Sequence, residues 1–423
     1  MASTVKDAIR RGRKSVETVV EEGRKKVENV VEGGLNTVET VVEAGLNTVE
    51  TVVVKGRRTV ESAVSLGRRT VEHALIRERS TMNAAVLHGR EDVRIEQVPF
   101  PKAAAGELVV RVGAALTCGT DLKVFRRGYH ARMIVPPALF GHEMAGTVVE
   151  AGQGVMEFAA GDRVVALNSA PCGHCYFCLR NQENLCDDLL FNNGAYAEFI
   201  RIPARIVAMN TLKVPDHVPL EHAALTEPLA CAVHGFEDSR PHPGDTVAII
   251  GGGPLGLMIL HVAALAGCEV IALVKLDGQV EAARQLGAAH VVQTTNIREA
   301  IQETRSLTHG RGADIAIEAV GVPEAWQEAV ELVRKGGTVN FFGGCAVGTH
   351  VTLDTNRIHY SDITLRATFH HTPAICRRAL DLIAGGRFQA GAFITGHAHL
   401  YELNRVLEKL MKRSTEIKTA IVP

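Results

Sequence analysis

The stretch TVAIIGGGPLGLMILHVAALAG, residues 246–267, is the feature that constrains the fold most. An apolar run of strand length ends in three glycines and continues directly as a helical pattern. In that context Gly251 permits a tight turn, Gly253 lets a pyrophosphate approach the positive end of the helix, and Gly256 lets helix and strand pack closely. The segment therefore predicts a dinucleotide-binding loop, formed by Gly251, Gly253, Pro254, Leu255 and Gly256.

Strand-like and helix-like runs alternate from about residue 246 to residue 370. Apolar strands that alternate with helices predict a parallel sheet covered on both faces. The acidic residue that binds a ribose hydroxyl is expected about twenty positions after the loop, but Val274 and then Lys275 stand at that place. A missing carboxylate beside a cation favours NADP over NAD, although Asp277 could still reach a ribose if the loop curls back.

Residues 172–186, CGHCYFCLRNQENLC, hold four of the nine cysteines of the chain. Their spacing brings four thiolates around one ion. Zinc favours sulfur ligands, and a four-cysteine set leaves no open coordination position, so we interpret the cluster as a structural zinc lobe. An iron–sulfur cluster uses the same number of cysteines and is the alternative. The predicted ligands are Cys172, Cys175, Cys178 and Cys186.

A second set of metal-binding side chains is divided among three motifs: Cys118 in CGTD, His142 and Glu143 in GHE, and Glu227 in TEPLACAVHG. Each motif alone is common, since a lone cysteine is usually a buried packing residue. A thiolate, an imidazole and a carboxylate together form the ligand set of a catalytic zinc ion and leave one position for substrate. The combination therefore predicts a second, catalytic zinc site.

Residues 82–423 resemble the zinc-dependent medium-chain dehydrogenases of the alcohol dehydrogenase superfamily, nearest the sorbitol and threonine dehydrogenase branches. The resemblance implies an α/β architecture in which a GroES-like β catalytic domain lies beside a doubly wound parallel Rossmann sheet. It implies one catalytic and one structural zinc ion, with NADP or NAD as cofactor. The matching segments are CGTD at 118–121, GHE at 141–143, GDRV at 161–164, the four-cysteine lobe, EPLACAVHG at 227–235 and GGGPLG at 251–256.

The resemblance also implies a role for each matched residue. Cys118 and His142 would be zinc ligands, while Glu143 and Glu227 would be ligands or neighbours that exchange with water. Asp121 would orient His142 from behind, and Thr120 would begin a proton relay from the substrate hydroxyl. The expected reaction is zinc-assisted hydride transfer between a secondary alcohol or polyol and the nicotinamide.

The outer member of that relay is left open by the sequence. His130, in RRGYHARM, is a candidate because it shortly follows the CGTD loop, but an exposed loop histidine is an equal alternative. His370 and His371, in TFHHTP, follow the last strand of the alternating region and are candidates for the wall of the cleft.

The first eighty residues follow a different pattern: six units of eleven residues run without a gap from residue 12 to residue 77, beginning with GRKSVETVVEE. Eleven residues make about three helical turns, so equivalent valines share one face. The glycines and β-branched valines lower intrinsic helicity, so we expect a long amphipathic arm that is helical on a surface or disordered when free. Lipid-interface binding, self-association and docking to another protein are all open, and the repeats resemble those of synucleins and exchangeable apolipoproteins.

We expect residues 1–81 to form this arm, 82–220 the GroES-like domain completed by 375–423, and 221–374 the dinucleotide-binding domain. The formal net charge of -1 gives no indication of nucleic-acid binding. Clustered rather than scattered cysteines favour metal binding in a reducing cytoplasm, with the arm allowing a peripheral position on a membrane. Relatives in the family imply a homodimer or homotetramer. The alternative function is a structural, lipid-surface protein in which the arm is the main functional part.

Overall fold

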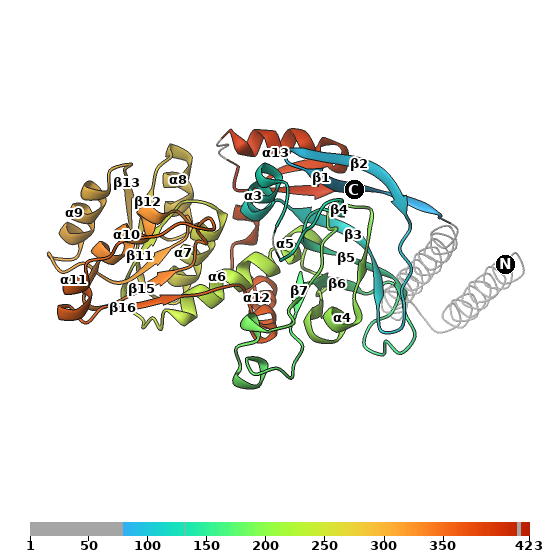
Figure 1. The fold of residues 1–423 in the computed structure, drawn as a ribbon, viewed down its shortest axis with the longest axis horizontal. Coiled ribbons are helices and arrows are strands. Elements are labelled where there is room, and N and C mark those ends of the chain that lie inside the picture. The colour runs from blue at the N-terminus through green and yellow to red at the C-terminus, as the bar shows by residue number, and fades with distance from the viewer. Residues whose placement is uncertain (1–78, 131, 413–415) are drawn as a thin grey trace, which may run out of the picture. The chain divides into compact units, whose positions relative to one another are not determined.

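In the computed structural model, residues 79–130, 132–412 and 416–423 are described, so the predicted arm lies almost wholly outside the described residues. Ser80–Pro423 form one compact unit. The unit contains a six-stranded parallel sheet at one end and three β-sheets at the other (Figure 1). This arrangement confirms the predicted α/β fold class.

The parallel sheet has the strand order β13-β12-β11-β14-β15-β16. After β11 the chain builds β12 and β13 on one side and then returns to build β14 and its successors on the other. The order therefore reverses between β11 and β14, which is where doubly wound sheets bind ligands. The strands are β11 (Thr246–Ile250), β12 (Glu269–Val274), β13 (His290–Gln293), β14 (Ala313–Glu318), β15 (Val333–Phe341) and β16 (Thr364–Ala367).

Helices cover both faces of this sheet, as its apolar strands require. In β11, Val247 and Ile249 belong to one buried cluster and Ile250 to another, because neighbouring side chains of a strand point to opposite faces. The first cluster contains residues of α6, α7 and α12, and the second contains residues of α9 and α10. The helices are α6 (Thr226–Asp238), α7 (Pro254–Leu265), α8 (Asp277–Gln285), α9 (Ile297–Leu307), α10 (Pro323–Leu332), α11 (Thr355–Tyr360) and α12 (Pro373–Ala384).

The largest sheet of the β-rich part has seven strands, and in it the C-terminal strand of the chain returns to pair with an early strand. The C-terminal strand β18 pairs antiparallel with β3, with Ala420 opposite Leu116, and parallel with β17. The strands are β3 (Leu108–Leu116), β5 (Glu143–Ala151), β6 (Arg163–Ala166), β9 (Phe199–Ile202), β10 (Thr211–Lys213), β17 (Ile394–His399) and β18 (Lys418–Val422).

Two small sheets and short helices complete the β-rich part. A three-stranded sheet has the order β2-β1-β4, and β7 pairs with β8. The elements are β1 (Thr81–Gly89), β2 (Asp92–Pro99), β4 (Ala138–Leu139), β7 (Ser169–Ala170), β8 (Leu190–Phe191), α3 (Gly119–Arg127), α4 (Ala204–Asn210), α5 (Leu220–Ala224) and α13 (Leu403–Met411).

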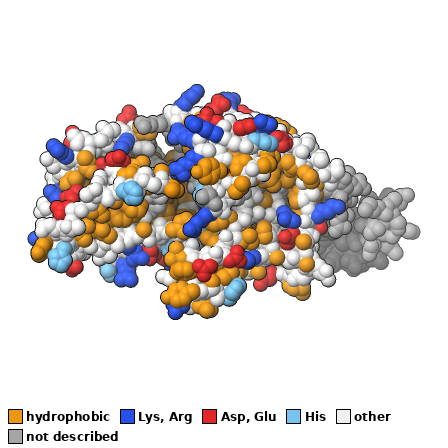
Figure 2. All heavy atoms as spheres, in the orientation of Figure 1, with side chains coloured by type: hydrophobic (Ala, Val, Ile, Leu, Met, Phe, Trp, Pro, Cys, Tyr) orange, Lys and Arg blue, Asp and Glu red, His pale blue; other side chains and the backbone are white. Residues whose placement is uncertain are grey.

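One buried cluster connects the β-rich part to the parallel sheet. It includes Leu116 and Ala145 from β3 and β5 together with Leu229 of α6 and Val247 of β11. On the face drawn in Figure 2, side chains of both charge signs are interspersed with apolar ones. Within the described ranges, no helix has the length and apolar character needed to cross a membrane.

Candidate metal and cofactor sites

Cys118 occupies the N-terminal cap of α3, which fixes its position. Its thiol accepts a hydrogen bond from the backbone N–H of Thr120 at 3.4 Å, and the Asp121 carboxylate accepts one from the Cys118 N–H at 3.1 Å. This reciprocal capping satisfies backbone donors that a helix start leaves free. The local sequence CGTD therefore holds the thiol at the N-terminal end of α3.

Asp121 connects α3 to His142. Its Oδ1 lies 3.0 Å from His142 Nδ1, and its Oδ2 accepts a hydrogen bond from the Tyr196 hydroxyl at 2.6 Å. Burial disfavours a charged imidazole here, but Asp121 and the Cys118 thiol outweigh it and raise the pKa of His142 well above its usual value. An Nδ1–H that donates to Asp121 leaves Nε2 as the free ligand atom, which is how metal-binding histidines are usually oriented.

Three of the predicted catalytic side chains lie together. One ligand atom from each of Cys118, His142 and Glu143 falls within 4.8 Å of the other two. His142 and Glu143 are buried, and Cys118 is partly exposed. A thiol, an imidazole and a carboxylate at this separation fit a zinc ion.

Glu143 has a partner that the sequence reading did not identify. The ammonium group of Lys418 donates to its two carboxylate oxygens at 2.8 and 2.6 Å and to the Thr117 carbonyl at 2.8 Å. Although burial disfavours the charged amine, Glu143 holds the pKa of Lys418 above its usual value. A lysine in the otherwise apolar C-terminal segment IKTAIVP was the available signal.

Glu227, in the first turn of α6, lies in a second group with His370 and His371, again with ligand atoms within 4.8 Å. His371 Nε2 is 3.7 Å from a Glu227 oxygen. Burial raises the pKa of Glu227 to about 7, although the His142 charge opposes the rise. Both predicted cleft histidines therefore lie beside a predicted catalytic carboxylate.

His130 has a local structural contact instead. Its Nδ1 accepts hydrogen bonds from the backbone N–H groups of Arg132 and Met133, each at 3.2 Å. Burial lowers the pKa of His130, which favours the neutral ring that these bonds require. The described contacts of this residue are those of a loop-stabilising histidine.

The four cysteines of the predicted lobe converge. Cys178 Sγ lies 3.9 Å from Cys172 Sγ and 3.5 Å from Cys175 Sγ, and Cys175 Sγ lies 3.9 Å from Cys186 Sγ. Zinc–sulfur bonds of about 2.3 Å in a tetrahedron place sulfurs about 3.8 Å apart, so the group fits one zinc ion.

The thiols of this lobe have opposite protonation tendencies. Backbone N–H groups of Cys178 and Asp187 lower the pKa of Cys175 to about 6, whereas burial raises the pKa of Cys178 to about 12. A cation at the centre of the group is what favours four deprotonated sulfurs.

The glycine loop has the backbone that a dinucleotide needs. Gly251 ends β11 with φ of 116°, a region that side chains disfavour. A Cβ on Gly256 would lie 1.9 Å from the Gly251 carbonyl oxygen, so helix α7 can approach the loop only with glycine there. Gly253 caps α7 and Pro254 and Leu255 form its first turn, so backbone N–H groups of the helix start are available to a phosphate.

The end of β12 has the predicted residues in place. Val274 is buried as the last residue of the strand, and Lys275 is exposed directly after it. Asp277 begins α8 and accepts a hydrogen bond from the Gln293 side chain at 2.6 Å. The nearest carboxylate is therefore engaged by a residue of β13.

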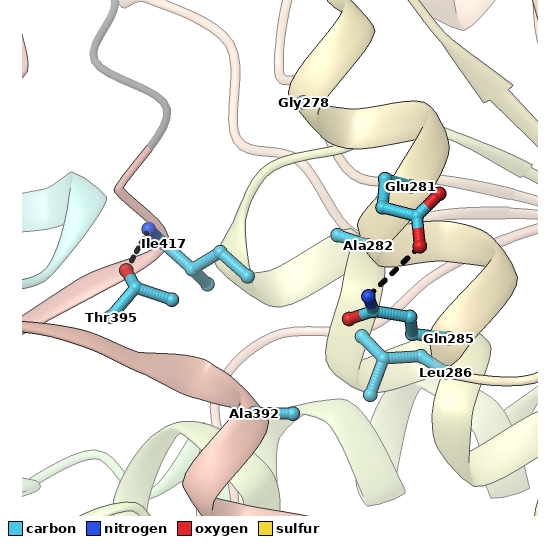
Figure 3. Close-up of a pocket in the computed structure, with 8 residues that line it drawn as sticks. All are labelled: Gly278, Glu281, Ala282, Gln285, Leu286, Ala392, Thr395 and Ile417. Atoms are coloured by element: carbon cyan, nitrogen blue, oxygen red, sulfur yellow. Dashed lines mark hydrogen bonds between the residues drawn. The ribbon is translucent and has the colours of Figure 1, made fainter.

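A separate cavity of about 260 Å³ lies between α8 and the chain around β17 (Figure 3). It shares no residue with the sites above. Its lining residues are Gly278, Glu281, Ala282, Gln285, Leu286, Ala392, Thr395 and Ile417.

Two family models match the chain: the alcohol dehydrogenase GroES-like domain over residues 104–216 and the zinc-binding dehydrogenase over residues 254–385. The sorbitol dehydrogenase of Bacillus subtilis is 31% identical over 347 residues, which cover 80% of this chain and 96% of that protein. The L-threonine 3-dehydrogenase of Bacillus licheniformis is 31% identical over 344 residues, 79% of this chain and 96% of that protein.

Solved structures agree with these relatives. A zinc-binding dehydrogenase of Sinorhizobium meliloti, bound to NADP, superposes with a TM-score of 0.73 at 30% identity and covers 82% of this chain and 100% of that one. The 2R,3R-butanediol dehydrogenase of Bacillus subtilis gives 0.73 at 26% identity and covers 81% and 99%. Zinc and NAD(P) are thus the cofactors, and the chain belongs to the zinc-dependent medium-chain dehydrogenases, with sorbitol and threonine dehydrogenases among its relatives and hydride transfer at a CH–OH group as its activity.

Proposed function

We propose that this enzyme oxidises a secondary hydroxyl group of a small polyol, or reduces the corresponding ketone, at the site of Cys118 and His142. The observation that carries the proposal is the meeting of Cys118, His142 and Glu143 within 4.8 Å, with Asp121 hydrogen bonded behind the imidazole. When bound there, zinc supplies Lewis acidity towards the substrate oxygen, and NAD(P)⁺ accepts the hydride.

The protein side chains have distinct roles in this proposal. Cys118 and His142 hold the metal, and Asp121 fixes the imidazole with Nε2 towards it. Thr120, in the first turn of α3, accepts the proton of the substrate hydroxyl into a hydrogen-bonded chain.

The two glutamates differ in availability. Either carboxylate would be the third protein ligand or a neighbour that exchanges with water. Glu143 lies with Cys118 and His142, but Lys418 engages its two oxygens, whereas Glu227 lies with His370 and His371.

Cys172, Cys175, Cys178 and Cys186 hold the second, structural zinc ion in this proposal. Their sulfur–sulfur distances of 3.5 to 3.9 Å support it. Four free thiols maintained for a metal fit a reducing compartment such as the cytoplasm.

The substrate class follows from the relatives. Their names specify sorbitol, erythritol or L-threitol, D-arabinitol and 2R,3R-butanediol, all of which carry hydroxyl groups on adjacent carbons, beside L-threonine. A screen of cofactor reduction over alcohols and polyols, with NADP⁺ and NAD⁺ in turn, tests the proposal. We expect turnover of secondary alcohols by the wild type and none by Cys118→Ser; an undiminished rate in that variant would refute it.

The nicotinamide cofactor is proposed to be NADP. The exposed Lys275 follows buried Val274 at the place of the ribose-binding acid, and Asp277 is engaged by Gln293. Removing the charge in Lys275→Ala should lower kcat/KM for NADP⁺ about tenfold and leave that for NAD⁺ nearly unchanged. Equal effects on the two cofactors would reject the assignment.

We further propose that residues 82–220 with 375–423 form the catalytic domain and 221–374 the cofactor domain, in a homodimer or homotetramer. The return of β18 to β3 supports the first assignment. Light scattering of the purified protein tests the assembly, and a monomeric mass would reject it.

The repeats of residues 12–77 support a second candidate function, binding to a lipid surface. The valines recur at eleven-residue spacing, and residues 1–81 contain 15 Lys and Arg against 12 Asp and Glu. Co-sedimentation of the full chain with anionic vesicles, alongside a chain that lacks residues 12–77, tests it. Binding that requires the repeats supports the proposal, whereas vesicle-independent association would favour self-assembly through the arm.

A further inference from the structure

His370 lies at the wall of the proposed site, in the segment between β16 and α12. One of its ring nitrogens lies within 4.8 Å of ligand atoms of both Glu227 and His371. Glu227 belongs to the proposed catalytic centre, so His370 lies beside a carboxylate of that centre.

The backbone of His370 is held in an uncommon conformation. Its φ of 62° lies in the left-handed region, which residues other than glycine adopt rarely and mainly where the surroundings hold them. His234 Nδ1 donates to the His370 carbonyl at 2.7 Å, and Asn184 Nδ2 donates to the Phe369 carbonyl at 3.0 Å. These bonds from two other segments fix where the ring projects.

Only one of the two ring nitrogens of His370 is hydrogen bonded within the described residues. His370 Nε2 is hydrogen bonded to the buried Ser169 hydroxyl at 2.6 Å, whereas Nδ1 has no hydrogen-bond partner among the described residues. His371 is different, because Cys376 Sγ and Asn168 Oδ1 contact its two nitrogens, each at 3.2 Å. His371 is therefore a packing residue, and His370 has a nitrogen available to a ligand.

We propose that His370 is a specificity residue: its free nitrogen binds the hydroxyl on the carbon next to the reacting one, so that the enzyme prefers vicinal diols. The inference rests on the proposed dehydrogenase function and names the substrate feature that this site selects. Ser169 holds the orientation of the ring, and the substrate hydroxyl, being both donor and acceptor, can bind either tautomer of the imidazole.

A variant of His370 should affect substrates differently if the residue binds substrate than if it only supports the loop. If His370 only held the loop, its replacement would disturb all substrates alike. If His370 binds the second hydroxyl, its replacement should leave kcat/KM unchanged for an alcohol that lacks that hydroxyl. A pair of substrates that differ in one hydroxyl, butane-2,3-diol and butan-2-ol, separates the two.

The test compares kcat/KM for these substrates in the full-length wild type and in His370→Gly. Glycine is chosen because it adopts the left-handed backbone without strain and carries neither ring nitrogen, whereas asparagine would keep a polar amide atom at the position of Nδ1. We expect kcat/KM for the diol to fall about tenfold, the effect of one hydrogen bond, and that for butan-2-ol to stay within about twofold. His359→Ala, which removes an exposed imidazole from α11, is the control and should change neither value.

An equal fall for both substrates, or no fall for the diol, would overturn the role of His370. A wild type that oxidises butan-2-ol as well as the diol would overturn it too, while leaving the proposed dehydrogenase function intact. A wild type inactive on every alcohol would instead refute the proposed function. If His370→Gly does not fold, Ser169→Ala, which frees the ring to turn, should lower the ratio of kcat/KM for the diol to that for butan-2-ol, and an unchanged ratio would count against the proposal.

Discussion

Lys418 is a buried cation that depends on one carboxylate. Its side chain is 1% exposed. The Glu143 side chain, which accepts two hydrogen bonds from the Lys418 ammonium group, is 0% exposed. Two charges out of water are tolerated because each is paired and hydrogen bonded, and removal of one partner leaves the other uncompensated. The pair therefore links the C-terminal strand to the catalytic centre.

Lys418→Met is expected to lower the free energy of unfolding by about 3 kcal/mol, because it leaves the Glu143 charge buried alone. Lys418→Met combined with Glu143→Gln should recover part of that loss. Urea denaturation measures the free energy of unfolding of the single and the double variant. Lys409→Met is the control, since its ion pair with Glu416 is more exposed and should contribute less than about 1 kcal/mol. A Lys418→Met protein as stable as the wild type would contradict this account.

The sequence predicted the residues whose partners are near in the chain. Cys118, Thr120 and Asp121 follow one another, and their capping geometry is local. Lys418 was missed because its partner Glu143 lies 275 residues away, and a single sequence carries no sign of such a pairing. Tyr196, which donates to Asp121 from 75 residues away, was missed for the same reason.

At the scale of elements, the four-cysteine lobe has little apolar core of its own. Tyr176 is 60% exposed, Leu179 is 72% exposed and Leu185 is 44% exposed. Short 3₁₀ turns at Cys178–Arg180 and Glu183–Leu185 are its regular structure. A segment of this kind is held by its metal more than by burial.

Cys175→Ser should therefore release one zinc ion and make residues 172–190 the first site of proteolysis. Limited digestion followed by mass spectrometry locates the cut. Cys268→Ser, which removes a thiol outside the lobe, should leave the digestion pattern unchanged. Protection of the lobe in Cys175→Ser would show that zinc does not stabilise it.

Helix α7 is joined to the C-terminal region through His261. Its Nδ1–H donates to the Leu286 carbonyl at 2.9 Å, and its Nε2 accepts from the Gln389 N–H at 3.1 Å. Burial lowers the pKa of His261, so the folded protein keeps the ring neutral while the unfolded chain takes up a proton. This contribution to stability is present above the unfolded pKa of about 6.5 and declines as the pH falls below it.

The wild type should lose more stability between pH 7 and pH 5 than His261→Gln, whose amide keeps a donor and an acceptor but does not titrate. Urea unfolding at the two pH values gives the comparison. Equal losses in the two proteins would mean that His261 does not titrate differently on unfolding.

The elements of the parallel sheet were predicted well because their signals are local. The runs TVAII, EVIALV and ADIAIE form β11, β12 and β14 as expected. Strand β17, ITGHAH, was not predicted, since it is mostly half-buried or exposed and rich in histidine. The order of the seven-stranded sheet was also beyond reach, because it depends on pairings such as Ala420 with Leu116.

At the scale of the whole molecule, one buried cluster connects the β-rich part to the parallel sheet. The group of Cys118, His142 and Glu143, the group around Glu227 and the glycine loop therefore belong to one compact unit. The N-terminal region of α6 supplies Glu227, and its later residues pack in the cluster that contains β11, so one helix connects the proposed metal centre to the cofactor sheet. The predicted arm lies outside the described residues, and the catalytic proposal does not depend on it.

The most direct test of the account is zinc content measured together with turnover in the wild type and Cys118→Ser. We expect about two zinc ions per wild-type chain, one at each proposed site. We expect about one in Cys118→Ser, with the fold kept and alcohol oxidation lost. A Cys118→Ser protein that retains both metal ions and full turnover would contradict the central claim.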